Sequence, residues 1–416
     1  GHKHLMRTPA SAPNWRTPFV ILLAGTTIVF LSLGARMTFG LWMPDASNDL
    51  FGGQIEVLSL AIALQSLFWG IGTPIAGNIA DKYGTGRVIA AAGLIYTAGL
   101  LLMTVSTSPL MAHLSIGVFT GFAMSGAMFP IILSAISRAV APEKRDFYLG
   151  IASAGGSSGQ VIMIPLGQFF IDSQGWVVSL YIMSMMTLLI VPLAFVMVRK
   201  NVGGGSAAAL PPQGTGEAIR EAFTHRGYVL LTCGYFVCGL QTMFIGTHFP
   251  NMLRNLEIDA SIAAMSLSLI GAFNIIGTFA WGAAGGKFRQ KFLLCWLYSL
   301  RSVIMVVFIL LPPTTMSVII FSAFMGILWL GTVPLTGSIV ARVFGLRYMG
   351  MLFGFAFVAH QFGSFIGIYA AGYFFDLFGN YNVIWWAAII MGFVASLMNF
   401  PINDKPIERE AAPQQA

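Results

Sequence analysis

The sequence has 416 residues, of which 56% are hydrophobic and only 9% are charged. Soluble domains carry about 25% charged residues, so this composition excludes a water-soluble fold and requires a lipid bilayer around the chain. The 22 basic and 15 acidic residues give a net charge of +7. The three cysteines lie in apolar stretches and have no spacing typical of a disulfide framework or a metal site.

Twelve apolar segments follow one another along the chain, each long enough for a membrane crossing of about 20 residues. We predict an all-α membrane protein whose first six spans cover residues 17–43, 55–80, 87–105, 109–138, 147–171 and 175–198. The second six cover 228–253, 260–285, 291–311, 315–341, 348–375 and 381–401. The chain therefore divides into a six-helix bundle at 1–198, a polar linker at 199–227, and a second six-helix bundle with a short tail at 228–416.

Lysine and arginine are concentrated in the loops on one side of these spans. If the N-terminus is cytoplasmic, 19 of the 22 basic residues lie in cytoplasmic segments, Arg254 lies on the opposite side, and Arg36 and Arg301 lie within spans. An excess of basic residues marks the cytoplasmic side of a membrane protein. We therefore expect a multi-pass protein of the bacterial inner membrane with both termini and the linker in the cytoplasm. The loop charges are assigned to topology and not to nucleic-acid binding.

The two halves of the sequence superpose after a shift of 204 to 206 residues. Equivalent positions include Ile71-Gly72-Thr73 and Ile276-Gly277-Thr278, Gly77–Tyr83 and Gly282–Phe288, Arg36 and Gln241, and Gly150 and Gly354. A constant offset over five helix pairs indicates an internal repeat, as in many transporters. Because each half has an even number of spans, both halves share one orientation and face each other across a central path.

The loop after the second span, Gly77-Asn-Ile-Ala-Asp81-Lys82-Tyr-Gly84-Thr-Gly-Arg87, resembles the signature loop of the major facilitator superfamily. The resemblance implies that fold, with two pseudo-symmetric six-helix bundles. It also implies a gate at Asp81, Lys82 and Arg87, in which Asp81 caps the next helix and pairs with nearby basic groups. The second copy has Gly286 at the position of Asp81, which predicts a weaker lock there.

Three further stretches are similar to bacterial members of the monocarboxylate porter and oxalate–formate exchanger group: Gly34-Ala-Arg36-Met-Thr-Phe-Gly, Gly246-Thr-His248-Phe-Pro250 and Gly331-Thr-Val-Pro334-Leu-Thr. This resemblance covers nearly the whole chain and implies transport of a small organic anion. Porters of the group typically carry an arginine in the eighth span, where this chain has uncharged residues around Asn274 and Thr278. Its second intramembrane arginine, Arg301, is in the ninth span.

Arg36 and Arg301 lie at membrane depth, where a charged side chain is costly and suggests a functional site. All fifteen carboxylates lie in loops or at span ends, so the spans favour an anionic ligand that a guanidinium can hold through paired hydrogen bonds. Arg36 is the stronger candidate because it shares a helix face with Ser32 and Gly40, and the alternative is that its side chain snorkels outward or bonds a broken backbone. For Arg301, structural bracing and substrate contact or gating both remain open.

Neutral polar or aromatic residues in other spans complete the predicted substrate path, although each could instead serve helix packing. They are Gln65, Gln160, Gln241, His248, Asn274, Trp329, His360 and Gln361. Without a carboxylate inside the spans, proton coupling would depend on His248 or His360, because histidine titrates near neutral pH. The alternative proton carrier is the substrate itself.

The sequence thus predicts a secondary transporter, not an enzyme, that moves a small organic anion such as a monocarboxylate by alternating access with proton symport. The alternatives are organic-anion exchange, efflux of a hydrophobic drug, and a membrane sensor that binds its ligand without moving it. The expected partners are the anion, protons and the lipid bilayer. We expect a monomer without nucleic acid, metal or cofactor.

Overall fold

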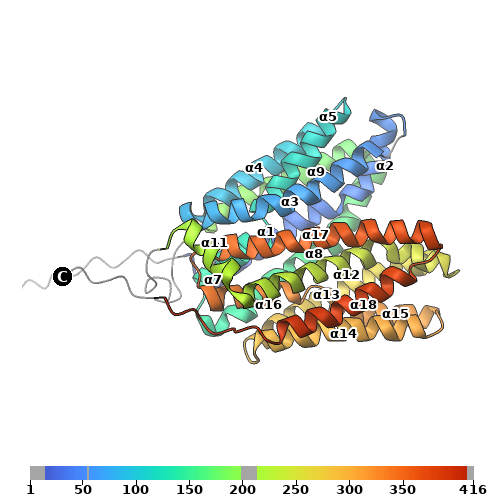
Figure 1. Ribbon diagram of the computed structural model, residues 1–416. Helices are drawn as coiled ribbons and strands as arrows, with labels where there is room; N and C mark the ends of the chain where they lie inside the picture. The colour runs from blue at the N-terminus through green and yellow to red at the C-terminus, as the bar shows by residue number, and fades with distance from the viewer. Residues whose placement is uncertain (1–14, 54–55, 198–212, 410–416) are drawn as a thin grey trace, which may run out of the picture.

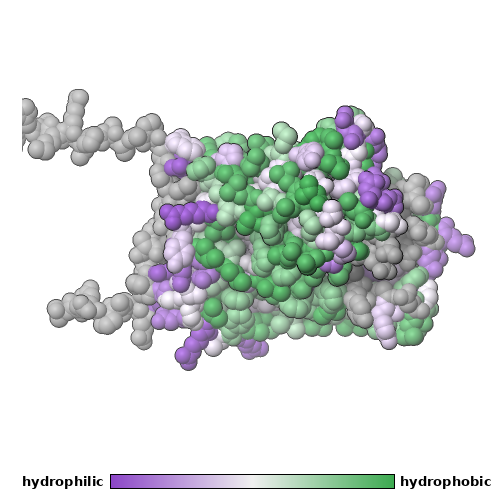
Figure 2. All heavy atoms as spheres, turned by 90° about the horizontal axis from the view of Figure 1, so that it is seen from above, coloured by the Kyte–Doolittle hydropathy of each residue, from purple (hydrophilic) through white to green (hydrophobic). Residues whose placement is uncertain are grey.

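The computed structural model describes residues 15–53, 56–197 and 213–409, in which all regular elements are helices. Within these residues, twelve helical segments are long and apolar enough to cross a membrane. Figure 2 shows a broad apolar band between two ends where hydrophilic residues gather. The predicted all-α membrane fold with twelve spans is therefore confirmed.

The first six spans are built from α1 (Pro18–Met37) to α10. The other elements are α2 (Phe39–Leu50), α3 (Glu56–Tyr83), α4 (Thr85–Thr104), α5 (Pro109–Ala112), a π-helix (His113–Phe119), α6 (Thr120–Gly126), α7 (Phe129–Ala139), a 3-10 turn (Pro142–Lys144), α8 (Arg145–Gln174), α9 (Trp176–Leu188) and α10 (Ile190–Val196). Residues 199–212 of the predicted linker lie outside the described residues. Its described part contains α11 (Thr215–Thr224).

The second six spans are built from α12 (Arg226–Asn255) to α18. Between them lie α13 (Ala260–Gly285), α14 (Gln290–Leu310), α15 (Thr315–Ile327), α16 (Thr332–Phe344) and α17 (Met349–Phe378), followed by α18 (Asn382–Asn399). The tenth span is therefore broken between α15 and α16.

The fourth and tenth spans break at equivalent points of the repeat. Pro130 lies in the first turn of α7 and Pro334 in the first turn of α16. Proline is tolerated there because the first-turn N–H groups have no partner within the helix, whereas further inside it would remove a hydrogen bond. The position of these two prolines explains the breaks just before α7 and α16.

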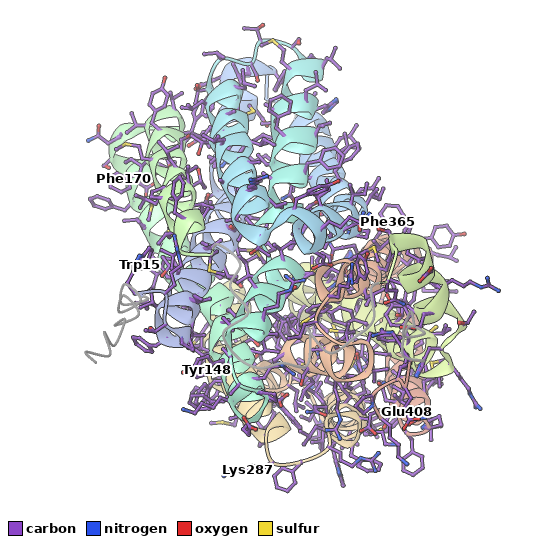
Figure 3. All side chains as sticks on the ribbon, turned by 90° about the vertical axis from the view of Figure 1, so that its left-hand side faces the viewer. Trp15, Tyr148, Phe170, Lys287, Phe365 and Glu408 are labelled. Atoms are coloured by element: carbon purple, nitrogen blue, oxygen red, sulfur yellow. The ribbon has the colours of Figure 1, made fainter. Side chains whose placement is uncertain are left out.

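The helices form two groups: α1 to α10 are the first group, and α12 to α18 are the second. The two groups meet at one end of the molecule and diverge toward the other. In Figure 1, α7, α11 and α16 lie at the closed end, whereas α2 and α5 lie far from α17 at the opposite end. We call these the α11 end and the α5 end. Figure 3, viewed from the α11 end, shows Tyr148 of α8 on the side of the first group that faces the second, and Phe147 packs on Phe279 of α13 with ring centroids 5.4 Å apart.

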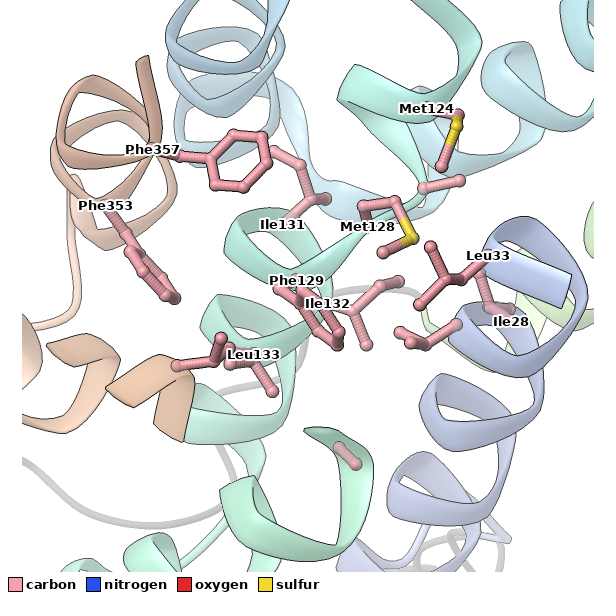
Figure 4. Packing of buried hydrophobic residues seen from close by; sticks show 14 of the residues in the cluster. Ile28, Leu33, Met124, Met128, Phe129, Ile131, Ile132, Leu133, Phe353 and Phe357 are labelled. Carbon is pink, nitrogen blue, oxygen red and sulfur yellow. The ribbon is translucent and has the colours of Figure 1, made fainter. Parts of the chain in front are cut away.

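Hydrophobic packing follows the same division. One buried cluster combines residues of both groups, and within it Phe353 and Phe357 of α17 point toward Ile131 and Leu133 of α7 (Figure 4). A second cluster contains buried residues of the second group alone, from Leu240 to Ile389. Among the described residues, the apolar core therefore runs from one group to the other through the first cluster.

Candidate functional site

Arg36 lies in the last turn of α1, next to the break at Thr38 that separates α1 from α2. A cation is favourable at this position because the final carbonyl groups of a helix carry partial negative charge. The Nε of Arg36 donates to Oε1 of Gln65 on α3 at 2.7 Å, and the guanidinium lies 5.4 Å from the ring of Phe39. The arginine is partly exposed, whereas Gln65 is fully buried.

The adjacent residues His360 and Gln361 lie on α17, against the turn of α3 that holds Gln65. Gln361 Nε2 donates to the carbonyl oxygen of Ser66 at 3.3 Å, and its Oε1 lies 3.1 Å from Nδ1 of His360. The imidazole of His360 is buried. The structure therefore brings four predicted site residues together where the two groups of helices meet.

Arg301, Asn274 and Trp329 gather around the break in the tenth span. Arg301 is fully buried and donates through Nε to the carbonyl oxygen of Leu328 at 2.7 Å and through Nη2 to that of Trp329. Asn274 Oδ1 accepts from the backbone N–H of Leu330 at 3.1 Å. A helix end leaves backbone groups without partners, and Arg301 and Asn274 supply them here. These contacts favour structural bracing over substrate contact or gating as the role of Arg301.

Asn274 also reaches across to the first group of helices. Its Nδ2 donates to Oγ of Ser157 on α8 at 2.6 Å. Gln160 lies one turn further along α8 and is partly exposed, and its side-chain amide forms no hydrogen bond with another described residue. The amide of Gln160 is therefore available to a ligand near the break.

Cys238 of α12, which has no distinguishing sequence pattern, contacts Arg301. Its Sγ lies 3.5 Å from Nη2 of Arg301 and 3.1 Å from Oγ1 of Thr332. Tyr235, one turn earlier on α12, packs on His360 with ring centroids 4.7 Å apart. Helix α12 thus carries neighbours of both Arg301 and His360, and the residues around them form one network.

Two predicted path residues lie apart from this network. Gln241, the repeat partner of Arg36, donates through Nε2 to the carbonyl oxygen of Ala388 on α18 at 2.8 Å. His248 Nδ1 lies 3.0 Å from the hydroxyl of Tyr381, and both rings contact Phe244. These contacts lie within the second group of helices. They favour helix packing over substrate contact as the role of both side chains.

The gate around Asp81 differs from the prediction. Asp81 does not cap α4, which follows Gly84 and has no side-chain cap. It accepts instead from the backbone N–H groups of Gly350 at 3.2 Å and Met351 at 2.8 Å, in the first turn of α17. A carboxylate is stabilised there by the unpaired N–H groups and the positive end of the helix dipole.

The ion-pair partner of Asp81 is Arg138 of α7, which the sequence pattern assigns only to topology. Arg138 also donates to the carbonyl oxygens of Leu346 at 2.9 Å and Arg347 at 3.3 Å. Lys82 and Arg87, the predicted basic members of the gate, are exposed. The gate is therefore a buried pair from the first group of helices that binds backbone groups of the second.

Comparison with known proteins agrees with this architecture. The sequence profile of the Major Facilitator Superfamily matches residues 25–368 and 231–415. The chain is 22% identical over 378 residues to YcxA, an uncharacterised MFS-type transporter of Bacillus subtilis (strain 168), with 87% of this chain and 90% of that protein covered. It is 24% identical over 289 residues to monocarboxylate transporter 11 of Mus musculus, with 67% and 60% covered. It is 23% identical over 379 residues to monocarboxylate transporter 13 of Bos taurus, with 90% and 86% covered.

Solved structures share the fold at low identity. A single-residue variant of the fucose:proton symporter FucP of E. coli superposes with a TM-score of 0.69 at 16% identity, with 92% of this chain and 98% of that chain covered. The proton:xylose symporter XylE superposes with a TM-score of 0.70 at 13% identity, with 94% and 97% covered. The chain therefore belongs to the Major Facilitator Superfamily and is a multi-pass membrane transporter that resembles the monocarboxylate transporters.

Proposed function

We propose that this protein is a secondary transporter of a small organic anion, of the monocarboxylate class, and that it works by alternating access with proton symport. The observation that carries the proposal is the guanidinium of Arg36, which lies at membrane depth beside a neutral amide. The three ion pairs between described residues involve Arg138, Arg289 and Arg409, and none includes Arg36.

A carboxylate is the ligand chemistry that suits Arg36. Nε is its hydrogen-bonding group toward the described residues, through Gln65, which leaves the terminal nitrogens for a substrate. Arginine binds carboxylates through two parallel N–H···O bonds, which lysine cannot reproduce. The ring of Phe39, 5.4 Å from the guanidinium, suits the apolar remainder of a monocarboxylate.

We assign proton coupling to His360 in preference to His248. His360 is connected to the Arg36 site through Gln361 and α3, whereas His248 contacts Tyr381. Protonation of the buried imidazole would add a second positive charge near the bound carboxylate, so proton and anion would favour each other's binding. A neutral imidazole lacks that attraction, so the anion would bind best together with the proton, as symport requires.

The basic residues support an orientation in the bacterial inner membrane with the α11 end in the cytoplasm. In this orientation the structure is closed toward the cytoplasm, and its helices diverge toward the outside. Uptake would then begin with anion binding at Arg36 and continue with opening of the α11 end. The two helix groups would rock about the site near Gln65 and Gln361.

The substrate class can be tested with purified protein in liposomes. The screen measures uptake of radiolabelled lactate, pyruvate, formate, oxalate and an aromatic acid under an inward proton gradient, with fucose and xylose as neutral controls. We expect uptake of at least one monocarboxylate, stimulated by the gradient, and none of the sugars. Uptake that needs an internal anion and ignores the gradient would favour exchange. Transport of neutral or hydrophobic compounds alone would contradict the proposal.

A further inference from the structure

At the α11 end, α3 meets α17 and α8 meets α13, and the internal repeat relates these two contacts. Each contact pairs an aspartate with a glycine, but the aspartate lies on the opposite member of the repeat-equivalent helix pair. At the contact of α3 with α17, Asp81 faces Gly350, and a Cβ atom on Gly350 would lie 3.0 Å from Oδ1 of Asp81. With the repeat offset, Asp81 corresponds to Gly286 and Gly350 corresponds to Asp146. The equivalent contact, of α8 with α13, therefore has the carboxylate on the other helix.

The structure places the Asp146 carboxylate in that second contact. Asp146 is buried in the first turn of α8, and a Cβ atom on Gly285 would lie 2.9 Å from its Oδ1. Gly150 and Gly282 allow the helices to touch, since a Cβ atom on Gly282 would lie 2.3 Å from Cα of Gly150. The close approach leaves the carboxylate within reach of donors on the second group of helices.

Both donors to Asp146 come from the other half of the protein. Nε2 of Gln290, at the start of α14, lies 3.3 Å from each carboxylate oxygen, and Oγ of Ser338 on α16 donates to Oδ1. Arg145 and Arg342 line a pocket together with Asp146. A carboxylate of the first half thus binds two helices of the second, much as Asp81 binds the start of α17.

We propose that Asp146 is a second gating residue, and that the α11 end opens only when the bonds of both Asp81 and Asp146 have broken. Two separate contacts must part because the helix groups meet at this end both through α3 and α17 and through α8 and α13. A pocket of about 440 Å³ lies beside Asp146, Gln290 and Ser338. Water in it can replace the two donors as the helices separate, which makes the contact reversible. The proposal concerns the conformational equilibrium and stands whichever substrate is carried.

The experiment measures the distance between spin labels at Tyr83→Cys and Phe288→Cys, two exposed and repeat-equivalent positions at the α11 end. The background is the whole 416-residue chain in nanodiscs with Cys233→Ser and Cys295→Ser, while Cys238 stays because it is fully buried. We expect one short distance before substitution at Asp146. Asp146→Asn removes the charge and one acceptor, so the ratio of the long to the short distance should rise about tenfold. The double variant with Asp81→Asn should shift further.

Asp172→Asn is the matched control, since this residue lies at the other end of α8 and accepts from Gln168 of the same helix at 2.8 Å. It should leave the distances unchanged. Ser338→Ala keeps the carboxylate and removes one donor, so it should give a smaller shift in the same direction. A folded Asp146→Asn variant with the distances of Asp172→Asn would overturn the proposal. If Asp146→Asn does not fold, unchanged distances in Ser338→Ala would overturn it.

Discussion

Arg301 of α14 donates its Nε hydrogen bond to the carbonyl oxygen of Leu328, where the tenth span breaks into two helices. A second bond to Trp329 makes this fully buried side chain a cap for the C-terminal end of α15. The negative end of that helix partly compensates the guanidinium charge. Arg301 and Arg36 thus have different environments, although both are intramembrane arginines beside a helix break.

Substitution of Arg301 should affect stability before substrate binding. Arg301→Ala leaves two carbonyl groups at the break without donors, and each loss costs about 1–3 kcal/mol. We expect a lower thermal midpoint and reduced yield of monodisperse protein, with Arg301→Lys intermediate because it keeps the charge. Fluorescence-detected size exclusion after heating measures this. A stable Arg301→Ala variant that fails to bind anion would indicate substrate contact instead of bracing.

Asp81→Asn should slow transport while the amount of folded protein stays nearly unchanged. The substitution removes the charge that pairs with Arg138 and caps α17, which weakens the closed state of the α11 end. Lys82→Gln and Arg87→Gln are the controls, since both side chains are exposed. These two variants should transport at nearly the original rate. Proteoliposome uptake rates decide between the two outcomes. Unchanged turnover in Asp81→Asn would contradict a gating role for this carboxylate.

The pH dependence of uptake should follow His360. His360→Gln should flatten the pH profile of uptake, and His248→Gln should preserve it. Initial uptake rates over a series of pH values, normalised to folded protein, provide the measurement. If the double variant keeps the original profile, histidine-based coupling is excluded, and the substrate's own proton or anion exchange accounts for the pH effect.

The orientation can be tested at α11. Glu217 is exposed on this helix, so Glu217→Cys should react with a membrane-impermeant maleimide in inside-out vesicles. It should stay unlabelled in intact cells. Cys233→Ser in the same chain removes the exposed native thiol. Labelling of intact cells from outside would reverse the assigned topology.

The sequence was sufficient to predict the spans and the repeat, since both depend on apolar length and on a constant offset. It could not predict contacts set by the packing of distant helices. Asp81 and Met351 are far apart in the chain, and only the approach of α3 to α17 makes the carboxylate a cap for α17 instead of α4. The repeat also predicts which positions are equivalent but not which neighbours surround them. Gln241 corresponds to Arg36, yet its side-chain amide donates a hydrogen bond to a backbone carbonyl of α18. Cys238 acquires its role only from its neighbours Arg301 and Thr332.

The central claim, an anion site at Arg36, is tested most directly by substrate binding to purified variants of matched thermal stability. A charge-assisted hydrogen bond contributes about 1.5–3 kcal/mol, so loss of the paired bonds should weaken binding at least about tenfold. We predict that Arg36→Ala abolishes measurable binding and uptake of the anion, while Arg36→Lys retains a small fraction with a raised half-saturation concentration. A well-folded Arg36→Ala protein that binds every anionic substrate with the original affinity would contradict the account and favour a neutral or hydrophobic cargo.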